Sequence, residues 1–231
     1  MSGDRGEWDY TRRYESALSG RRELEEREYG GVKEKYYLGR RMIVRDTPIN
    51  GGVYVCMDEK GQVEAVVVDD KKEKMFDVVY RKLLKRREET MRRTRDTFKS
   101  GLLNDVFEFV REEMPYNREE SDRLVAEDVK IGRKVTLAAF IAGKAGVCRH
   151  QALLTAYLLE RLQREGKINP RSISIDRNFL NDGRGHCWVR YTNSFGMVFI
   201  IDPAMGFVGR LDDPKRQGWP YERPEDEKKV R

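Results

Sequence analysis

The chain has 231 residues, of which 39% are hydrophobic and 37% are charged, and its formal net charge is +6. This length suits one domain of ordinary size with extensions, and no segment approaches the roughly 20 apolar residues that cross a bilayer. The first residues lack the apolar region of a signal peptide, so we expect a cytoplasmic protein with no membrane association. Three cysteines are too few for a disulfide framework and predict free thiols in a reducing compartment.

The N-terminal third of the chain divides by composition. Residues 1–35 are mostly charged and contain several glycines, so we expect an extension without a core, with room for a short helix at 21–28. From residue 36 to 70, β-branched and aromatic runs alternate with turns, which is typical of a small antiparallel unit built on a β-hairpin. So short a unit buries too little apolar surface to fold alone, and we expect it to pack on the rest of the chain.

Helical periodicity begins at residue 71 and extends to about 99, and a second helix is predicted over 102–113, before Pro115. A polar connector is expected over 117–122. The first helix carries the densest basic stretch of the chain, from Lys82 to Arg95. Acidic residues interrupt that stretch and few aromatic residues lie within it, so we interpret it as a solvated helix face with charge pairs and expect no nucleic-acid partner.

The segment from Cys148 to Leu162 is apolar over most of its circumference, which predicts a helix buried inside the domain. Gly143 and Gly146 precede it, so Cys148 is expected where a loop turns into a helix. The unpaired N–H groups and the positive end of the helix dipole favour a thiolate there, and the N–H of Cys148 itself is a candidate donor to an oxyanion. The alternative is a small buried cysteine that packs like alanine.

Strands are predicted at 172–175, 186–191 and 197–202, and the last two carry a candidate base and a candidate carboxylate. The chain has only two histidines, and His150 points away from Cys148 because it lies two residues further along the same helix. His186 is therefore the better base. If the two strands pair through a loop of odd length, His186 stands directly opposite Asp202 on one face of the sheet, where the carboxylate can orient the imidazole.

Two neighbouring side chains are candidate substrate-binding residues. Trp188 is expected on the face of His186, where it walls a substrate cleft or fills the core, and Arg149 either supports the thiolate or binds a substrate carboxylate. Zinc is the competing interpretation, because cysteine and histidine are zinc-ligand types. Adjacent strand residues such as His186 and Cys187 point to opposite faces, so we expect no metal site and no cofactor.

The motif Gly-Val-Cys-Arg-His-x-Ala-Leu-Leu, at 146–154, followed by Gly-His-Cys-Trp-Val and Ile-Ile-Asp-Pro, resembles the transglutaminase-like cysteine superfamily over roughly residues 100–212. Its form is most similar to the transglutaminase-like regions of bacterial proteins and of plant kinases related to ethylene-response regulators. The resemblance implies an α+β, papain-like core in which a buried helix bearing the cysteine packs on an antiparallel sheet. It also implies a triad of Cys148, His186 and Asp202.

These observations predict a catalytic core at 71–212 followed by a charged C-terminal tail at 213–231. We expect a thiol enzyme that acts on an amide of a protein or peptide substrate through a thioester, with water or an amine completing the turnover. A non-catalytic binding or regulatory module with the same fold is the first alternative, and a basic nucleic-acid adaptor is the second. The sequence does not fix the substrate or the oligomeric state.

Overall fold

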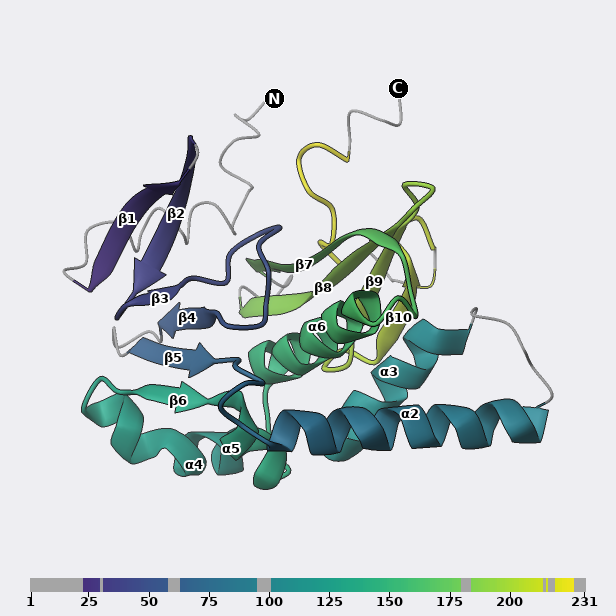
Figure 1. The fold of residues 1–231 in the computed structure, drawn as a ribbon, viewed down its shortest axis with the longest axis horizontal. Coiled ribbons are helices and arrows are strands. Elements are labelled where there is room, and N and C mark those ends of the chain that lie inside the picture. Colours follow the sequence, from purple (N-terminus) through teal and green to yellow (C-terminus); the bar gives the residue numbers. More distant parts are fainter. Residues whose placement is uncertain are drawn as a thin grey trace.

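The computed structural model describes the chain in seven stretches, which are residues 23–29, 31–57, 63–94, 101–179, 184–213, 215 and 219–226. In these residues the fold is mixed α and β, with five helices and three sheets (Figure 1). The sheets have the strand orders β1-β2-β3, β4-β5-β6 and β10-β9-β8-β7. No helix in this part of the chain is both long enough and apolar enough to cross a membrane.

The first sheet is a hairpin of β1 (Leu24–Tyr29) and β2 (Val32–Tyr37), extended by the short β3 (Arg40–Arg41). The expected helix at 21–28 is therefore wrong over the described residues 24–28, because pairing with β2 draws these charged residues into a strand. Gly31 supplies the turn with a φ of 81°, which glycine adopts without strain. The predicted boundary at residue 35 falls inside β2.

The second sheet joins distant parts of the chain. β4 (Val53–Met57) and β5 (Val63–Val67) are antiparallel, and β6 (Lys134–Thr136) lies parallel to β5, so this sheet is mixed. The side chains of Tyr54 and Val66 belong to the main hydrophobic cluster, together with residues of all five helices. The opposite face contributes Val53 and Val55 to a smaller cluster that contains Tyr37.

The helices are α2 (Met75–Thr94), α3 (Leu102–Glu113), α4 (Arg118–Lys130), α5 (Leu137–Ala142) and α6 (Cys148–Arg164). The bounds of α3 are those predicted. The expected connector at 117–122 is wrong, because these residues start α4. Asn117 caps that helix by accepting a hydrogen bond from the N–H of Glu120 at 3.0 Å, so its polar side chain marks a helix start and not a loop.

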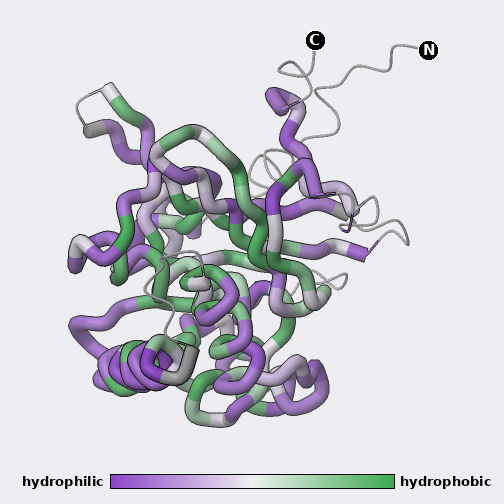
Figure 2. The backbone as a smooth tube through the Cα atoms, turned by 90° about the vertical axis from the view of Figure 1, so that its right-hand side faces the viewer, coloured by the Kyte–Doolittle hydropathy of each residue, from purple (hydrophilic) through white to green (hydrophobic). Residues whose placement is uncertain are grey.

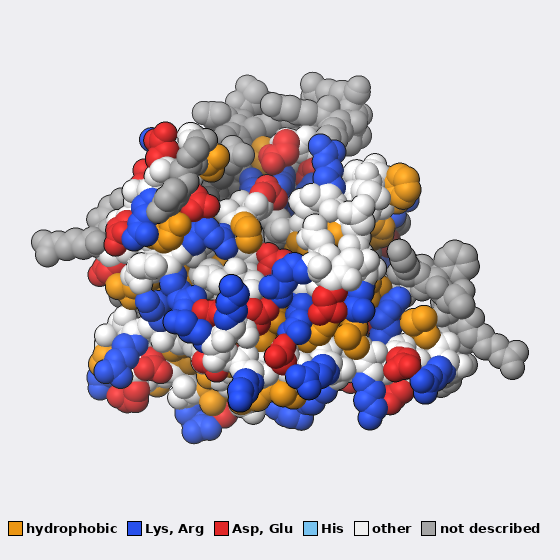
Figure 3. Space-filling model, viewed as in Figure 1, with side chains coloured by type: hydrophobic (Ala, Val, Ile, Leu, Met, Phe, Trp, Pro, Cys, Tyr) orange, Lys and Arg blue, Asp and Glu red, His pale blue; other side chains and the backbone are white. Residues whose placement is uncertain are grey.

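The basic stretch lies on α2 as far as residue 94, residues 95–99 of the predicted helix lie outside the described residues, and five cations of the described part have acidic partners. Figure 2 looks along α2 and shows mostly hydrophilic turns, and Figure 3 shows Lys and Arg side chains interspersed with Asp and Glu over one face of the molecule. In the described part of α2, five ion pairs involve its cations, of which three connect α2 with α3 and two lie within α2. They are Lys82–Glu113, Arg86–Glu112, Arg87–Asp105, Lys85–Glu89 and Arg92–Glu88.

The third sheet supports the candidate site. It consists of β7 (Pro170–Phe179), β8 (Gly185–Asn193), β9 (Val198–Asp202) and β10 (Phe207–Arg210), and all neighbours are antiparallel. We call it the main sheet. The buried helix α6 packs against β7, β8 and β9 and also contacts α3 and α5, so it lies inside the fold (Figure 1). Burial of α6 on nearly all sides explains why its sequence is apolar around most of its circumference.

Candidate active site

The start of α6 is held by the segment that follows α3. The N–H of Gly146 donates to the carbonyl of Pro115 at 3.1 Å, and the carbonyl of Gly146 accepts from the N–H of Asn117 at 2.9 Å. A Cβ atom at Gly146 would lie 2.4 Å from the sulfur of Met114, so any other residue here would force the buried Met114 side chain to move. The crossing places Cys148 in the first turn of α6, where backbone N–H groups have no helical acceptor.

His150 is fully buried and completes the cap of the same helix. Its Nδ1 accepts a hydrogen bond from the N–H of Val147 at 3.1 Å, and its Nε2 lies 2.8 Å from Oε1 of Glu64. Because Nδ1 is an acceptor, the ring proton lies on Nε2 and is donated to Glu64. Burial lowers the pKa of His150, which favours this neutral form. The ring is therefore a structural cap, in agreement with the expectation that His150 is not the base.

Glu64, on β5, is a residue that the sequence analysis missed. Burial by itself raises the pKa of its carboxyl group, but the hydrogen bond from His150 and the charge of Arg149 outweigh burial and lower the pKa to about 2. The Nε of Arg149 donates to the same carboxylate. The available signal was a single acidic residue within an otherwise apolar strand. Arg149, predicted to bind substrate, is thus held against Glu64, with part of its side chain exposed.

His186 and Asp202 are brought together on the main sheet. The Nε2 of His186 lies 2.6 Å from Oδ2 of Asp202, and both side chains are buried. The other carboxylate oxygen, Oδ1, accepts from the N–H of Met205 at 3.1 Å. Tyr221, in the segment predicted to be a charged tail, also donates its hydroxyl to Oδ2 at 2.8 Å. Asp202 is therefore fixed at both oxygens.

The register of β8 and β9 differs from the predicted one. Thr192 pairs with Val198, so the connecting loop has odd length and the two residues share a face, as expected. However, Val189 pairs with Ile201, which puts Asp202 at the level of Trp188 and not of His186. The prediction that His186 stands directly opposite Asp202 is wrong by two residues. The contact is diagonal, and the length of the imidazole side chain spans it.

His186 is also the partner of the Cys148 thiol, and because its Nε2 is bound to Asp202, we infer that Nδ1 is the nitrogen on the side of Cys148. Hydrogen bonds with Cys187 and with His186, together with the charges of His186 and Arg149, overcome burial and hold the pKa of the Cys148 thiol well below its ordinary value. Burial by itself lowers the pKa of His186, but Asp202 and Cys148 outweigh it and raise the pKa to about 10. Between these two pKa values the pair is a thiolate and an imidazolium.

Cys187, next to His186 on β8, is buried in the main hydrophobic cluster, against which Cys148 packs. Its hydrogen bond with Cys148 and its burial raise the pKa of the Cys187 thiol, so Cys187 stays protonated. The Cys187 thiol is therefore the hydrogen-bond donor, and the Cys148 thiolate is the acceptor. We expect Cys187→Ala to raise the pH midpoint of Cys148 alkylation, because the thiolate loses a donor. Iodoacetamide rates measured across pH check this, with Cys56→Ala as the control. An unchanged midpoint in Cys187→Ala would contradict the assigned donor.

Trp188, the second predicted substrate-binding residue, is 2% exposed in this structure. Its ring centroid lies 5.9 Å from that of His186 and 4.9 Å from that of Tyr221, which it meets edge-on. It forms a small hydrophobic cluster with Ile200 and Tyr221. Trp188 therefore packs beside the base, under the C-terminal segment, and a contact of Trp188 with substrate stays a prediction.

Comparison with protein families identifies the region that contains this site. A family model described as a transglutaminase-like domain matches residues 87–207, just over half of the chain. The matched region contains Cys148, His186 and Asp202, whereas Glu64 and Tyr221 lie outside it. No match was found among curated proteins or among solved structures.

Proposed function

We propose that this chain, which belongs to the transglutaminase-like domain family, is a cysteine-dependent acyl-transfer enzyme whose chemistry is carried by Cys148, His186 and Asp202. The observation that carries the proposal is the 2.6 Å contact of His186 with the buried Asp202, because this histidine also helps to lower the pKa of the Cys148 thiol. A partly exposed thiol at a helix start, beside an oriented imidazole, has the arrangement that nucleophilic catalysis requires.

In the proposed reaction, the thiolate of Cys148 attacks the carbonyl carbon of an amide and forms a tetrahedral oxyanion. The N–H of Cys148, unpaired in the first turn of α6, is one donor to that oxyanion. The C–N bond then breaks, and the leaving amine takes a proton from the imidazolium of His186. A thioester remains on Cys148. Water or a second amine attacks it, gives a proton to His186, and releases the acyl product and the thiolate.

The substrate in this proposal is a protein or peptide, and the chemistry is of the peptidase, deamidase or transglutaminase type. We include the side chains of Arg149 and Trp188 in the proposal as contacts of the substrate. A cytoplasmic location, where thiols stay reduced, is part of the proposal. We also propose that the 146–154 motif is more closely related to the transglutaminase-like regions of bacterial proteins and plant kinases than to other members of the superfamily.

An activated ester tests acyl transfer without knowledge of the substrate. With p-nitrophenyl acetate, we expect a burst of nitrophenolate and one acetyl group on the peptide that contains Cys148, detected by mass spectrometry. Slow turnover follows as water removes the acetyl group. Added methylamine distinguishes the two outcomes of the second step, because an enzyme that transfers to amines forms N-methylacetamide.

Two variants make this test specific. Cys148→Ala is expected to abolish both the burst and the acetylated peptide, whereas Cys56→Ala is expected to retain them. A burst that persists unchanged in Cys148→Ala, with acetyl groups only on lysines or on Cys56, would contradict an enzymatic function. In that case, the folded chain would fit a binding or regulatory module that keeps the transglutaminase-like fold.

A further inference from the structure

The face of the main sheet that carries His186 and Asp202 is covered by residues 219–226. Alternation along β8 places His186, Trp188 and Arg190 on this face, whereas α6 packs on the other face, and its first residue, Cys148, meets His186 at the start of β8. We call residues 219–226 the C-terminal segment. It was predicted to be part of a charged tail, and it lies beyond the region matched by the family model.

Tyr221 is the buried centre of this segment. Its ring stacks on that of Phe207, with centroids 5.6 Å apart, and meets the edge of Trp188. Its hydroxyl donates to Oδ2 of Asp202 at 2.8 Å, the same oxygen that His186 contacts at 2.6 Å. The phenol therefore touches the triad at its carboxylate, and its ring is packed against two aromatic neighbours.

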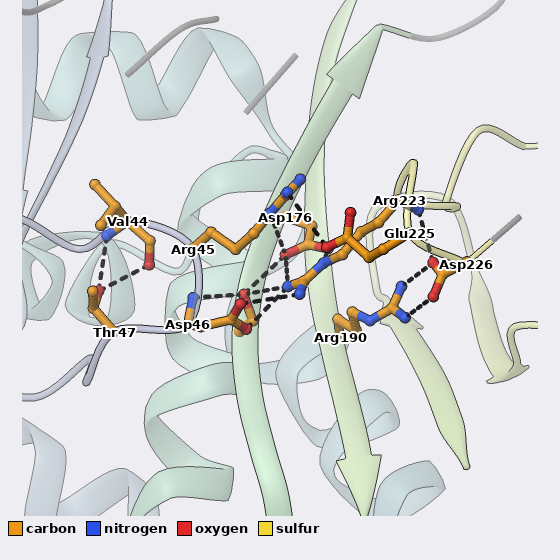
Figure 4. A network of polar contacts seen from close by, with 10 residues as sticks. Val44, Arg45, Asp46, Thr47, Asp176, Arg190, Arg223, Glu225 and Asp226 are labelled. Atoms are coloured by element: carbon orange, nitrogen blue, oxygen red, sulfur yellow. Dashed lines mark hydrogen bonds and ion pairs between the residues drawn. The ribbon is translucent and has the colours of Figure 1, made fainter. Parts of the chain in front are cut away.

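Ion pairs on the same face hold the segment in place (Figure 4). Arg223 makes two 2.6 Å contacts with the carboxylate of Asp176 on β7, and it also reaches both oxygens of Asp46 at 3.0 and 3.1 Å. Asp226 receives two hydrogen bonds from Arg190 on β8, at 2.8 and 2.5 Å. These paired, bidentate contacts leave Tyr221 little freedom to move away from Asp202.

We propose that Tyr221 is a positioning residue of the reaction and that its hydroxyl fixes the Asp202 carboxylate against His186. This inference rests on the proposed function. Asp202 is buried and accepts from His186, Tyr221 and the N–H of Met205. A buried carboxylate with one donor fewer holds its charge and its orientation less well. His186 then loses part of the negative charge that stabilises its imidazolium, and the thiolate of Cys148 loses its partner.

Tyr221→Phe tests the hydroxyl alone, because phenylalanine keeps the ring and its stacking. We expect the rate of Cys148 alkylation by iodoacetamide at pH 6 to fall about 10-fold, with the pH midpoint moving up toward that of an ordinary thiol. The matched control is Tyr191→Phe, a buried tyrosine on the opposite face of β8 that packs on Phe199. That variant is expected to react like the unmodified chain.

Proton NMR gives a second reading that a purely structural role would not move. The chain has two histidines, and each donates a ring N–H to a buried carboxylate, His150 to Glu64 and His186 to Asp202. In Tyr221→Phe we expect the low-field N–H resonance of His186 to shift. The resonance of His150 should stay in place and reports that the fold is intact. Loss of one signal in His186→Ala assigns the two.

The outcomes separate this inference from the function on which it rests. If Cys148 of the unmodified chain reacts early with iodoacetamide, and Tyr221→Phe leaves both the alkylation profile and the His186 resonance unchanged, the positioning role is wrong and the proposed function stands. If Cys148 of the unmodified chain reacts only near the ordinary thiol pKa of about 8.5, the proposed function and this inference both fail.

Discussion

Replacing His186 with alanine is expected to lower the rate at which iodoacetamide alkylates Cys148 at pH 5.5 by about 50-fold. Without the imidazolium, the pKa of the thiol returns toward about 8.5, so the thiolate is about 0.1% populated at this pH. Each remaining thiolate is more nucleophilic, because nucleophilicity rises with pKa, and this offsets part of a loss of thiolate that is at most about 1000-fold. The hydrogen bond from Cys187 remains in the variant and keeps the estimate from being larger.

The same experiment at high pH is the control. Near pH 9.5 an ordinary thiol is mostly ionised, so His186→Ala should recover most of its reactivity if it is folded. A variant that stays slow at all pH values has lost access to Cys148 or its fold. Equal profiles for His186→Ala and the unmodified chain would show that His186 does not stabilise the thiolate, and Cys148 would then lack a base.

Local patterns in the sequence predicted the helices whose apolar residues are regularly spaced or form a nearly continuous run. The bounds of α3 were accessible because its buried residues recur every three or four positions, and the start of α6 at Cys148 was accessible because two glycines precede a nearly continuous apolar run. The strand β1 was not, since its residues are charged and become a strand only by pairing with β2. The parallel pairing of β6 with β5 likewise joins residues far apart in sequence. Such pairings leave no local periodic signal.

The candidate site was accessible in part for the same reason. Cys148 and His186 each begin a predicted element and Asp202 ends one, so the register of the strands could predict roughly where the three side chains meet. The parity of the loop fixed their common face, whereas the level along the strands depends on which residues flank the turn, and this was off by two. Glu64 and Tyr221 reach the site from segments on either side of the predicted core. Only tertiary packing brings them there.

The second large effect is expected for Glu64→Ala, which should lower the free energy of unfolding by about 3 to 5 kcal/mol near neutral pH. The substitution leaves the partly buried guanidinium of Arg149 without its carboxylate and removes the acceptor of the buried His150. Removing one partner of a buried ion pair typically costs this amount, because the other charge stays buried and uncompensated. Chemical denaturation monitored by circular dichroism measures it. Glu88→Ala, which breaks an exposed pair with Arg92, should cost less than about 0.5 kcal/mol.

The pH dependence of this loss tests its electrostatic origin. The pKa of Glu64 is lowered from 4.5 to about 2 in the folded protein, so its contribution is fully present above about pH 4.5 and disappears as the pH falls toward 2. This difference corresponds to about 3 kcal/mol, in line with the cost of the substitution. The gap in stability between the unmodified chain and Glu64→Ala should therefore narrow over that range. A gap that stays constant from pH 7 to pH 3 would mean that lost packing explains the effect. A difference in the free energy of unfolding that narrows would show that the carboxylate charge of Glu64, on β5, stabilises the first turn of α6, where Cys148 lies.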